Sequence, residues 1–469
     1  MIEGLKPYTT YRDSGVPWLG RCPSHWDLRR TKILFQERVQ KGFPNEPLLA
    51  ATQTKGVVKK EDYGSRTVTA SKDFHLLKLV EIGDYVISLR SFQGGFEVAH
   101  HRGIISPAYT VLKPRSGAES GYFSHFFKSK PFIESLSLFV TGIREGQNID
   151  YSRFSRAEMP LPPDDEQAAI VRFLDHENRK TDQFIRAKRR LIALLNEQKQ
   201  AIIHRAVTRG LDAYVPLKPS GIPWIGNIPA HWHIWRIGHF AKVGNGSTPS
   251  RGRPDYWFGG TYPWLNSSNV NRGHVDSSDQ FVTPVALREC HLPYVQKDSV
   301  LVAITGQGKT RGMSAVLSIE ATINQHLAFI TSRKKIVTPH FLHLALSGAY
   351  AALRALSEDS GSTKGALTCE DIKRFKVPVP PMTEQKQLLD AIERATLRIK
   401  TAIARTEQEI SLVQEYRTRL TADIVTGKLD VRAAAAKLPD VEADIELSSD
   451  AVELDEELLE ESETEESDE

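Results

Sequence analysis

Three short patterns place residues where they could do chemistry. Residues 303–310 follow an apolar run and fit a relaxed phosphate-binding loop, in which Lys309 would contact a nucleotide. The tripeptide Glu-Gln-Lys at 384–386 is similar to an element of nuclease sites, and His340 and His343 have the spacing of two metal ligands on a helix. These patterns raise an ATPase or a nuclease as alternatives.

The residues around these patterns argue against catalysis. A phosphate loop needs a helix that begins at its lysine, whereas Gly312 and then a β-like run follow Lys309. The tripeptide at 384–386 falls in the first turn of a long helix, and its repeat counterpart at 166–168 has no lysine. No carboxylate or cysteine set completes a site around the two histidines. We therefore predict that the chain has no catalytic residue, no metal and no cofactor of its own.

Basic and amide side chains, with the aromatic Tyr256 and Trp257 beside them, collect in the loops of two variable segments. Such side chains can pair with phosphates and with base edges, although any one of them is more often a solvated surface residue. The DNA-binding candidates are Lys55, Lys59, Arg66, Arg90, Gln93 and Arg102 in the first segment and Arg251, Arg253, Asn266, Asn269, Arg272, Gln307, Lys309 and Arg311 in the second.

The charge distribution favours a polyanionic partner. Residues 1–439 hold 61 Lys and Arg against 42 Asp and Glu, a net charge of +19, whereas residues 440–469 hold 16 acidic residues and no basic one. Lys and Arg displace condensed counterions from phosphates, so a body this basic is typical of a nucleic-acid-binding protein. The acidic tail is predicted to be disordered, and it is either simply solvated or a DNA mimic that screens the basic body.

The chain carries no mark of a membrane or secreted protein. It has no stretch of 18 apolar residues and no signal pattern at its start, so we expect a cytoplasmic protein without membrane contact. Its cysteines, Cys22, Cys290 and Cys369, lie too far apart for a disulfide framework and are expected to be small buried hydrophobic residues.

A duplicated frame must position the candidate loops. Residues 14–26 return at 220–232 with eight of thirteen positions identical, an offset of 206. Residues 159–212 return at 377–430 at an offset of 218, without a gap. The segments between these matched ends look unrelated. The frame is therefore duplicated, and its contents have diverged.

The enclosed segments are typical of strand-rich α/β structure. Residues 79–89 and 300–304 are strand-like runs next to turn residues, and residues 121–138 and 339–356 look helical. The expected domains are a first recognition domain at 1–158, a long helix at 159–212, a second recognition domain at 213–376, a long helix at 377–430 and an acidic tail at 431–469.

Each copy of the second repeat predicts one long helix. Prolines precede it, Asp164 or Thr383 is placed to cap it, Asp164 with Gln167 fits a capping box, and a glycine follows its far end. Both copies keep one apolar seam in the same register, which favours an antiparallel coiled coil over packing of each helix on its own domain. The seam positions are Val171, Leu174, Ile185, Ile192, Leu195, Ile202, Leu389, Ile392, Ile403, Ile410, Val413 and Leu420.

Together these features resemble the specificity subunit of type I restriction-modification systems, over about residues 14–430. The resemblance is carried by the Pro-x-Pro-Pro-x-x-Glu-Gln helix starts at 160–167 and 378–385, the Gly-Ile-Pro-Trp segment at 221–224, the Gly-Ser-Thr-Pro-Ser run at 246–250 and the Asn-Gln-His element at 324–326. It implies an α/β (α+β) protein in which two target-recognition domains are separated by an antiparallel coiled coil with pseudo-two-fold symmetry.

The resemblance also implies a function and a set of partners. Each recognition domain would read one half of a bipartite double-stranded DNA target, while the helices set the spacer and dock methyltransferase subunits. Adenine methylation would use S-adenosylmethionine on those partners, and ATP with magnesium would serve a separate restriction and translocase subunit. The acidic tail falls outside this pattern.

Two other classes of protein remain as alternatives. An autonomous nuclease or ATPase would have to bind nucleotide at residues 303–310, which ATP binding with magnesium would reveal. A coiled-coil scaffold without sequence-specific DNA readout would show no steep weakening of duplex binding by salt.

Overall fold

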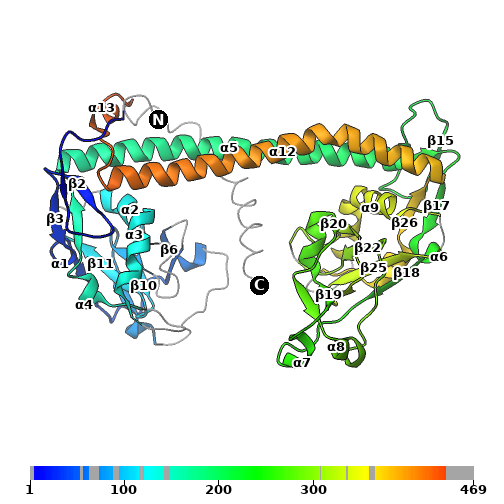
Figure 1. The fold of residues 1–469 in the computed structure, drawn as a ribbon, viewed down its shortest axis with the longest axis horizontal. Helices are drawn as coiled ribbons and strands as arrows, with labels where there is room; N and C mark the ends of the chain where they lie inside the picture. Colours follow the sequence, from blue (N-terminus) through cyan, green and yellow to red (C-terminus); the bar gives the residue numbers. More distant parts are fainter. Residues whose placement is uncertain are drawn as a thin grey trace. The chain divides into compact units, whose positions relative to one another are not determined.

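The structure is a computed structural model, and it describes residues 5–52, 56–62, 73–87, 95–115, 118, 121–141, 148–306, 308–333, 336–358 and 365–439. The chain divides into two compact units (Figure 1). Unit 1 contains the described residues up to 187 and from 408 onward, and unit 2 contains those from 188 to 407. Residues 440–469 of the predicted acidic tail, with their predicted disorder, lie outside the described residues. Residues 431–439, which the sequence assigned to the tail, instead belong to unit 1, because Val431 and Ala435 are buried in its core.

Unit 1 combines short helices with small antiparallel sheets. Its strands are β1 (Tyr11–Asp13), β2 (Arg21–Pro23), β3 (Asp27–Arg30), β4 (Phe35–Glu37), β5 (Leu49–Ala51), β6 (Val57–Lys59), β7 (Lys78–Val80), β8 (Tyr85–Ile87), β9 (Glu97–Val98), β10 (Gly103–Ile105), β11 (Thr110–Pro114), β12 (Val140–Thr141), β13 (Asn148–Ile149) and β14 (Glu158–Leu161). Its short helices are α1 (Thr31–Leu34), η1 (Lys60–Asp62), η2 (Phe74–Leu76), α2 (Tyr122–Phe127), α3 (Lys130–Ser135), η4 (Leu136–Phe139) and α4 (Tyr151–Phe154). The largest sheet has the order β4-β11-β8-β9, and β3 pairs with β14.

The core of unit 1 is a cluster of aromatic rings between its sheet and α2 and α3. The ring of Phe127 lies 4.9 Å from the rings of Phe96 and Phe132 and 5.1 Å from that of Tyr85, measured between centroids. The helix predicted over 121–138 is broken into α2, α3 and η4. Pro131 lies in the first turn of α3, where its missing N–H is tolerated; it could not continue an unbroken helix.

Unit 2 has a larger mixed sheet. Its strands are β15 (Leu217–Pro219), β16 (Asn227–Pro229), β17 (His233–Arg236), β18 (Ala241–Asn245), β19 (Tyr262–Leu265), β20 (His274–Val275), β21 (Gln280–Val282), β22 (Ser299–Ala303), β23 (Ser314–Leu317), β24 (Thr322–Ile323), β25 (Leu327–Ser332) and β26 (Lys376–Val379). Its short helices are α6 (Ile237–Phe240), α7 (Pro254–Trp257), η5 (Ser267–Arg272), α8 (Pro284–Glu289), α9 (Pro339–Gly348), α10 (Tyr350–Glu358) and α11 (Cys369–Arg374). The main sheet has the order β18-β25-β22-β23-β20, and a second has the order β21-β19-β24.

The same pair of β-ladders frames both units. β1 pairs with β2 as β15 pairs with β16, and β3 pairs with β14 as β17 pairs with β26. The register agrees residue for residue: Leu28 lies opposite Pro160, and Ile234 lies opposite Pro378, at the two offsets of the sequence repeat. The duplicated sequence therefore builds a duplicated framework.

Two long helices, and the short helix α13 (Arg432–Ala435) that follows the second, complete the described part of the chain. α5 (Asp164–Arg209) has 46 residues and α12 (Met382–Val425) has 44; Gly210 comes directly after α5 and Gly427 two residues after the end of α12, with φ of 74° and 75°. A positive φ at the residue after a helix suits glycine, which has no Cβ to oppose it. α5 begins at Asp164 itself, and α12 begins one residue before Thr383, so both residues lie inside the first turn of their helices rather than at the caps. Among the described residues, no helix is long and apolar enough to cross a membrane.

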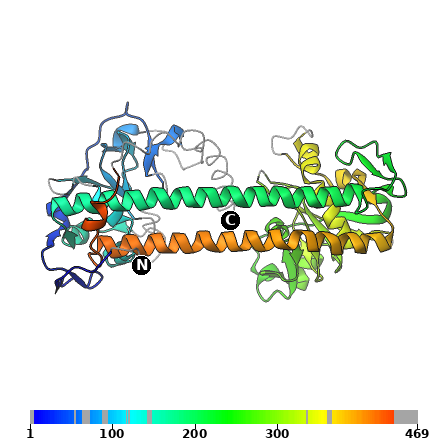
Figure 2. The ribbon, with the colours of Figure 1, turned by 90° about the horizontal axis from the view of Figure 1, so that it is seen from above.

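Within each unit, the beginning of one long helix packs beside the end of the other (Figure 2). In unit 1, Ile170 and Leu174 of α5 share a core with Leu420 and Ile424 of α12. In unit 2, residues at the end of α5 share a core with Leu388 and Ile392. The pairing is therefore antiparallel in both units, and every seam position predicted from the sequence is buried or half-buried.

Candidate functional site

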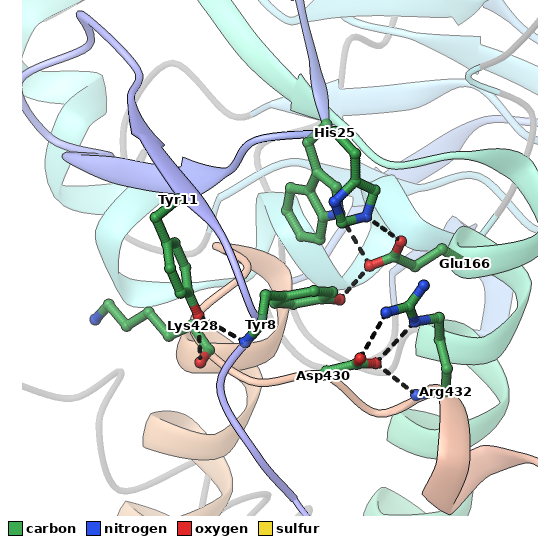
Figure 3. A network of polar contacts seen from close by, with 8 residues as sticks. Tyr8, Tyr11, His25, Glu166, Lys428, Asp430 and Arg432 are labelled. Carbon is green, nitrogen blue, oxygen red and sulfur yellow. Dashed lines mark hydrogen bonds and ion pairs between the residues drawn. The ribbon is translucent and has the colours of Figure 1, made fainter.

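A buried carboxylate joins the repeat elements of unit 1 (Figure 3). Glu166, in the first turn of α5, is 1% exposed. Its Oε1 accepts from Trp26 Nε1 at 2.9 Å and from the Tyr8 hydroxyl, and its Oε2 lies 2.9 Å from His25 Nε2. Burial, and then the hydrogen bond to Glu166, raise the pKa of Tyr8 far above its usual value. Tyr8 is therefore a permanent donor to this carboxylate.

The segment before β1 meets the segment after α12 beside this carboxylate. Lys6 and Asp430 form an antiparallel bridge, and the Tyr11 hydroxyl donates to the backbone carbonyl of Lys428 at 3.1 Å. Arg432 donates to Asp430 through Nε at 3.0 Å and Nη2 at 2.7 Å. Residues 5–11 and 428–432, which lie far apart in the sequence, are thereby held together by hydrogen bonds.

The corresponding junction of unit 2 is less complete. His231 Nε2 lies 2.8 Å from Glu384 Oε2, as His25 lies beside Glu166, but Glu384 is 23% exposed. Trp232 is fully buried, and in the part of the chain that the structure describes its Nε1 has no hydrogen-bond partner. The indole N–H of Trp26 in unit 1 thus has a hydrogen-bond acceptor, whereas that of Trp232 in unit 2 has none among the described residues.

This difference predicts unequal losses of stability from the same substitution in the two copies. Trp26→Phe and Trp232→Phe remove similar volumes, but only the first removes a hydrogen bond to a carboxylate, which contributes about 1.5–3 kcal/mol. We expect Trp26→Phe to destabilise unit 1 by about 1–3 kcal/mol more than Trp232→Phe destabilises unit 2. Hydrogen exchange of the β3 and β17 amides measures the two effects separately, and equal losses would contradict the assignment.

Two sequence motifs of unit 2 that lie far apart in the chain pack against each other. Gly246 N donates to the carbonyl of Asn324 at 3.2 Å, and Thr248 Oγ1 donates to Gln325 Oε1 at 2.7 Å. A Cβ at Gly246 would lie 1.7 Å from the Ile323 carbonyl oxygen, so only glycine permits this approach. The motifs at 246–250 and 324–326 therefore form one polar element.

The phosphate-loop-like segment is a turn between β22 and β23. Gly312 N donates to the Ala303 carbonyl at 2.9 Å, and no helix begins at Lys309. α10 holds the turn, because the Tyr350 hydroxyl donates to the Lys309 carbonyl at 2.7 Å and Arg354 Nη1 donates to that of Gly308 at 2.8 Å. A cavity of about 610 Å³ lies beside it, lined in part by Gln200, Asn271, Lys309, Ser347, Tyr350 and Arg354.

His340 and His343, the two histidines with metal-ligand spacing, do not act together. His343 lies on α9, and its Nδ1 is 2.9 Å from Ser314 Oγ of β23. Burial, and then the nearby charges of His340, His274 and Lys400, lower the pKa of His343 to about 4. The described residues contain no group of three or more side chains suited to a metal. His343 is thus a neutral core histidine near pH 7.

His343 makes the stability of unit 2 depend on pH. The unfolded chain binds a proton at this histidine with a pKa of 6.5, whereas folded unit 2 binds it only near 4. The free energy of unfolding therefore falls by up to about 3 kcal/mol as the pH drops from 6.5 to 4, and this contribution is constant above that range. Thermal unfolding across this range is expected to show the slope in the native chain and a reduced slope in His343→Gln.

The DNA-binding candidates of unit 2 fall into two groups. Arg251, Arg253, Arg272 and Lys309 have exposed side chains, although Arg253 also forms an ion pair with Asp255 at 2.5 Å. Three other described candidates, Asn266, Asn269 and Arg311, bond within the fold. The Asn266 side chain caps η5 in a reciprocal box with that of Asn269, and Arg311, 5% exposed, donates from Nη1 to the Gly365 carbonyl.

In unit 1 only two candidates can be placed. Lys59 is half-exposed on β6, with its Nζ 3.8 Å from Glu61 Oε1. Arg102 contacts Glu46 at 2.9 Å and Glu81 at 2.6 Å. Five further candidates lie outside the described residues: Lys55, Arg66, Arg90, Gln93 and Gln307.

The Glu166 network was missed by sequence reasoning, which treated Glu166 only as part of a helix start. A signal for it exists, because the His-Trp pairs at 25–26 and 231–232 recur with the glutamates at 166 and 384. Tyr8 and Arg432 lie outside the matched segments, so the comparison of the repeats did not point to them, although the offset of 206 places Tyr214 opposite Tyr8.

Comparison with known proteins finds a matching family model and related proteins. Residues 229–411 match a family model described as a type I restriction modification DNA specificity domain. The chain is 22% identical over 265 residues to the type I restriction enzyme EcoR124I/EcoR124II specificity subunit of Escherichia coli, covering 56% of this chain and 62% of that protein, less than two thirds of its length. It is 22% identical over 379 residues to the type I restriction enzyme MjaIX specificity subunit of Methanocaldococcus jannaschii, covering 78% and 83%.

A solved structure shares the fold. A chain from work on complex assembly and conformational transition of a type I R-M system superposes with a TM-score of 0.56 at 16% identity. The superposition covers 86% of this chain and 98% of that chain.

Proposed function

Because the chain belongs to the family of type I restriction-modification specificity subunits, as its repeated motifs predicted, we propose that it reads a bipartite DNA target. The recognition domains at 1–158 and 213–376 each read one half. The long helices at 159–212 and 377–430 act as an antiparallel coiled coil that sets the spacer between the halves.

The observation that carries this proposal is the pair of equivalent β-ladders around different contents. The ladders β3/β14 and β17/β26 have the same register, while the segments that they enclose differ in strand order and in sequence. The equivalent ladders hold the two recognition domains in the same way. The different segments that they enclose let each domain recognise its own base sequence. Such a molecule suits a target with two unlike halves.

Catalysis belongs to the partners in this proposal. Methyltransferase subunits dock on the long helices and bring S-adenosylmethionine, and a restriction and translocase subunit brings ATP with magnesium. The chain itself contributes base contacts and phosphate contacts, and Arg251, Arg272 and Lys309 are exposed candidate cations of unit 2 for them.

Genome-wide adenine methylation tests the proposal. In cells that express the full chain with its cognate methyltransferase, we expect a bipartite methylated motif that requires this chain. Arg251→Ala with Lys309→Ala, both in unit 2, should weaken or relax one half of the motif and leave the other intact. Arg374→Ala, an exposed arginine on α11 outside the recognition loops, is the control.

Two outcomes would overturn the proposal. If no motif depends on the chain while the methyltransferase is present and active, the chain is a scaffold. If both halves of the motif change equally in the double variant, the two units do not read separate halves.

A further inference from the structure

One loop of unit 2 holds an aromatic side chain out in solvent. Phe258, directly after α7, is 89% exposed. Its neighbours Tyr256 and Trp257, which the sequence suggested as nucleic-acid contacts, instead pack in a small core with Trp264 and Leu287. The residue free to meet a partner is therefore the one that the sequence did not single out.

The turn that carries Phe258 is held firmly. Phe258 N donates to the Pro254 carbonyl at 2.7 Å, and Gly260 N donates to that of Trp257 at 3.1 Å. A Cβ at Gly260 would lie 2.6 Å from the Phe281 carbonyl oxygen, so the turn rests directly on β21. The backbone of Phe258 is therefore fixed on both sides, although its ring is in water.

The indole of Trp257 anchors the loop and positions a cation. Its ring centroid lies 5.2 Å from that of Trp264, and its Nε1 donates to the Ser250 carbonyl at 3.1 Å. The Arg251 guanidinium lies 3.8 Å from the Trp257 ring centroid and donates to Gln280 Oε1 at 2.6 Å. Arg251 is exposed and pre-oriented by both contacts.

An exposed phenylalanine on a fixed turn beside a fixed arginine suits duplex DNA. Apolar side chains such as Phe act as wedges between base steps, and base–aromatic stacking accepts any base because every base has a π face. The guanidinium supplies the phosphate contact that such a wedge needs. The loop also lies within residues 229–411, the part that matches a DNA specificity domain.

We propose that Phe258 is a wedge that stacks on a base of the bound duplex at a step that it partly unstacks, while Arg251 contacts the flanking phosphate. This inference rests on the proposed DNA-reading function. Pyrimidine–purine steps unstack most easily, so the wedge also adds sequence preference without a hydrogen bond to a base edge.

The test uses the full chain in complex with its methyltransferase subunits and a duplex carrying the methylated motif. 2-Aminopurine replaces single purines across the half read by unit 2, and its fluorescence rises where the stack opens. The variants are Phe258→Ala and Phe258→Trp. Tyr214→Ala is the matched control, because Tyr214 is 95% exposed in unit 2 but lies in the connection between α5 and β15, away in sequence from the loop that carries Phe258.

We expect Phe258→Ala to lose the fluorescence rise and on the order of tenfold in affinity. The salt dependence of binding should not change, because no phosphate contact is removed. Phe258→Trp should keep both the rise and the affinity, and Tyr214→Ala should behave as the native chain.

The outcomes separate this inference from the proposed function. If the native complex binds the motif no better than unrelated DNA, both the proposed function and the wedge are wrong. Motif-specific binding that is unchanged in Phe258→Ala overturns the wedge alone. Loss of methyltransferase binding in Phe258→Ala would assign the side chain to a protein interface and also overturn it.

Discussion

Replacing Glu166 with alanine is expected to lower the free energy of unfolding of unit 1 by about 2–6 kcal/mol. Trp26 Nε1 and the Tyr8 hydroxyl both donate to this carboxylate inside unit 1. An unsatisfied buried polar group costs about 1–3 kcal/mol, and alanine leaves two of them. Hydrogen exchange of the β3 and β14 amides should rise by the corresponding factor.

Glu384→Ala is the matched control for this experiment. Glu384 occupies the equivalent position of the repeat, but its contact to His231 is exposed, and exposed ion pairs contribute about 0–1 kcal/mol. Exchange of the β17 and β26 amides should therefore change little. Similar losses in the two units would show that the helix start, rather than the buried network, sets the stability.

Gly246→Ala is expected to remove recognition by unit 2. The new Cβ would meet the Ile323 carbonyl oxygen at 1.7 Å, and a backbone atom cannot turn away as a side chain can. The segments at 246–248 and 323–325 must separate, at a loss of about 3 kcal/mol, the upper end of the usual cost of overpacking. Exchange of the β24 amides should rise, and methylation mapping should lose the half of the motif that unit 2 reads.

Gly252→Ala controls for the loss of glycine itself. Its Cβ would meet Ser250 Oγ at 3.7 Å, which is ordinary van der Waals contact. We expect native stability and a native motif. A Gly246→Ala chain with the same behaviour would mean that the two motifs need not touch.

The elements that follow from local pattern were predictable. α5 and α12 follow from apolar spacing and from the glycines after them, and the duplication of the framework follows from residues 14–26 and 220–232, although its β-ladders were not predicted. Both features depend on residues close in sequence or on direct comparison of the two copies, so a single sequence was enough to predict them.

The roles of the loop side chains were not predictable in the same way. Asn266 and Asn269 bond to each other, and Arg311 is buried against residue 365, which is 54 positions away. Whether a polar side chain faces solvent depends on such distant partners, and residue type alone does not report it. Phe258 shows the converse, since an apolar residue in a loop gives no sign that it stays exposed.

During synthesis on the ribosome, the core of unit 1 receives its last residues after the main core of unit 2 has received all of its own. That core includes Leu420, Ile424 and Val425 of α12, whereas the main core of unit 2 uses only residues between 203 and 392. A nascent chain stopped at residue 407 holds every side chain of the second core and lacks part of the first. The domain that is translated first is therefore completed last, and until then the apolar face around Ile170 and Leu174 stays open to chaperones and to other nascent chains.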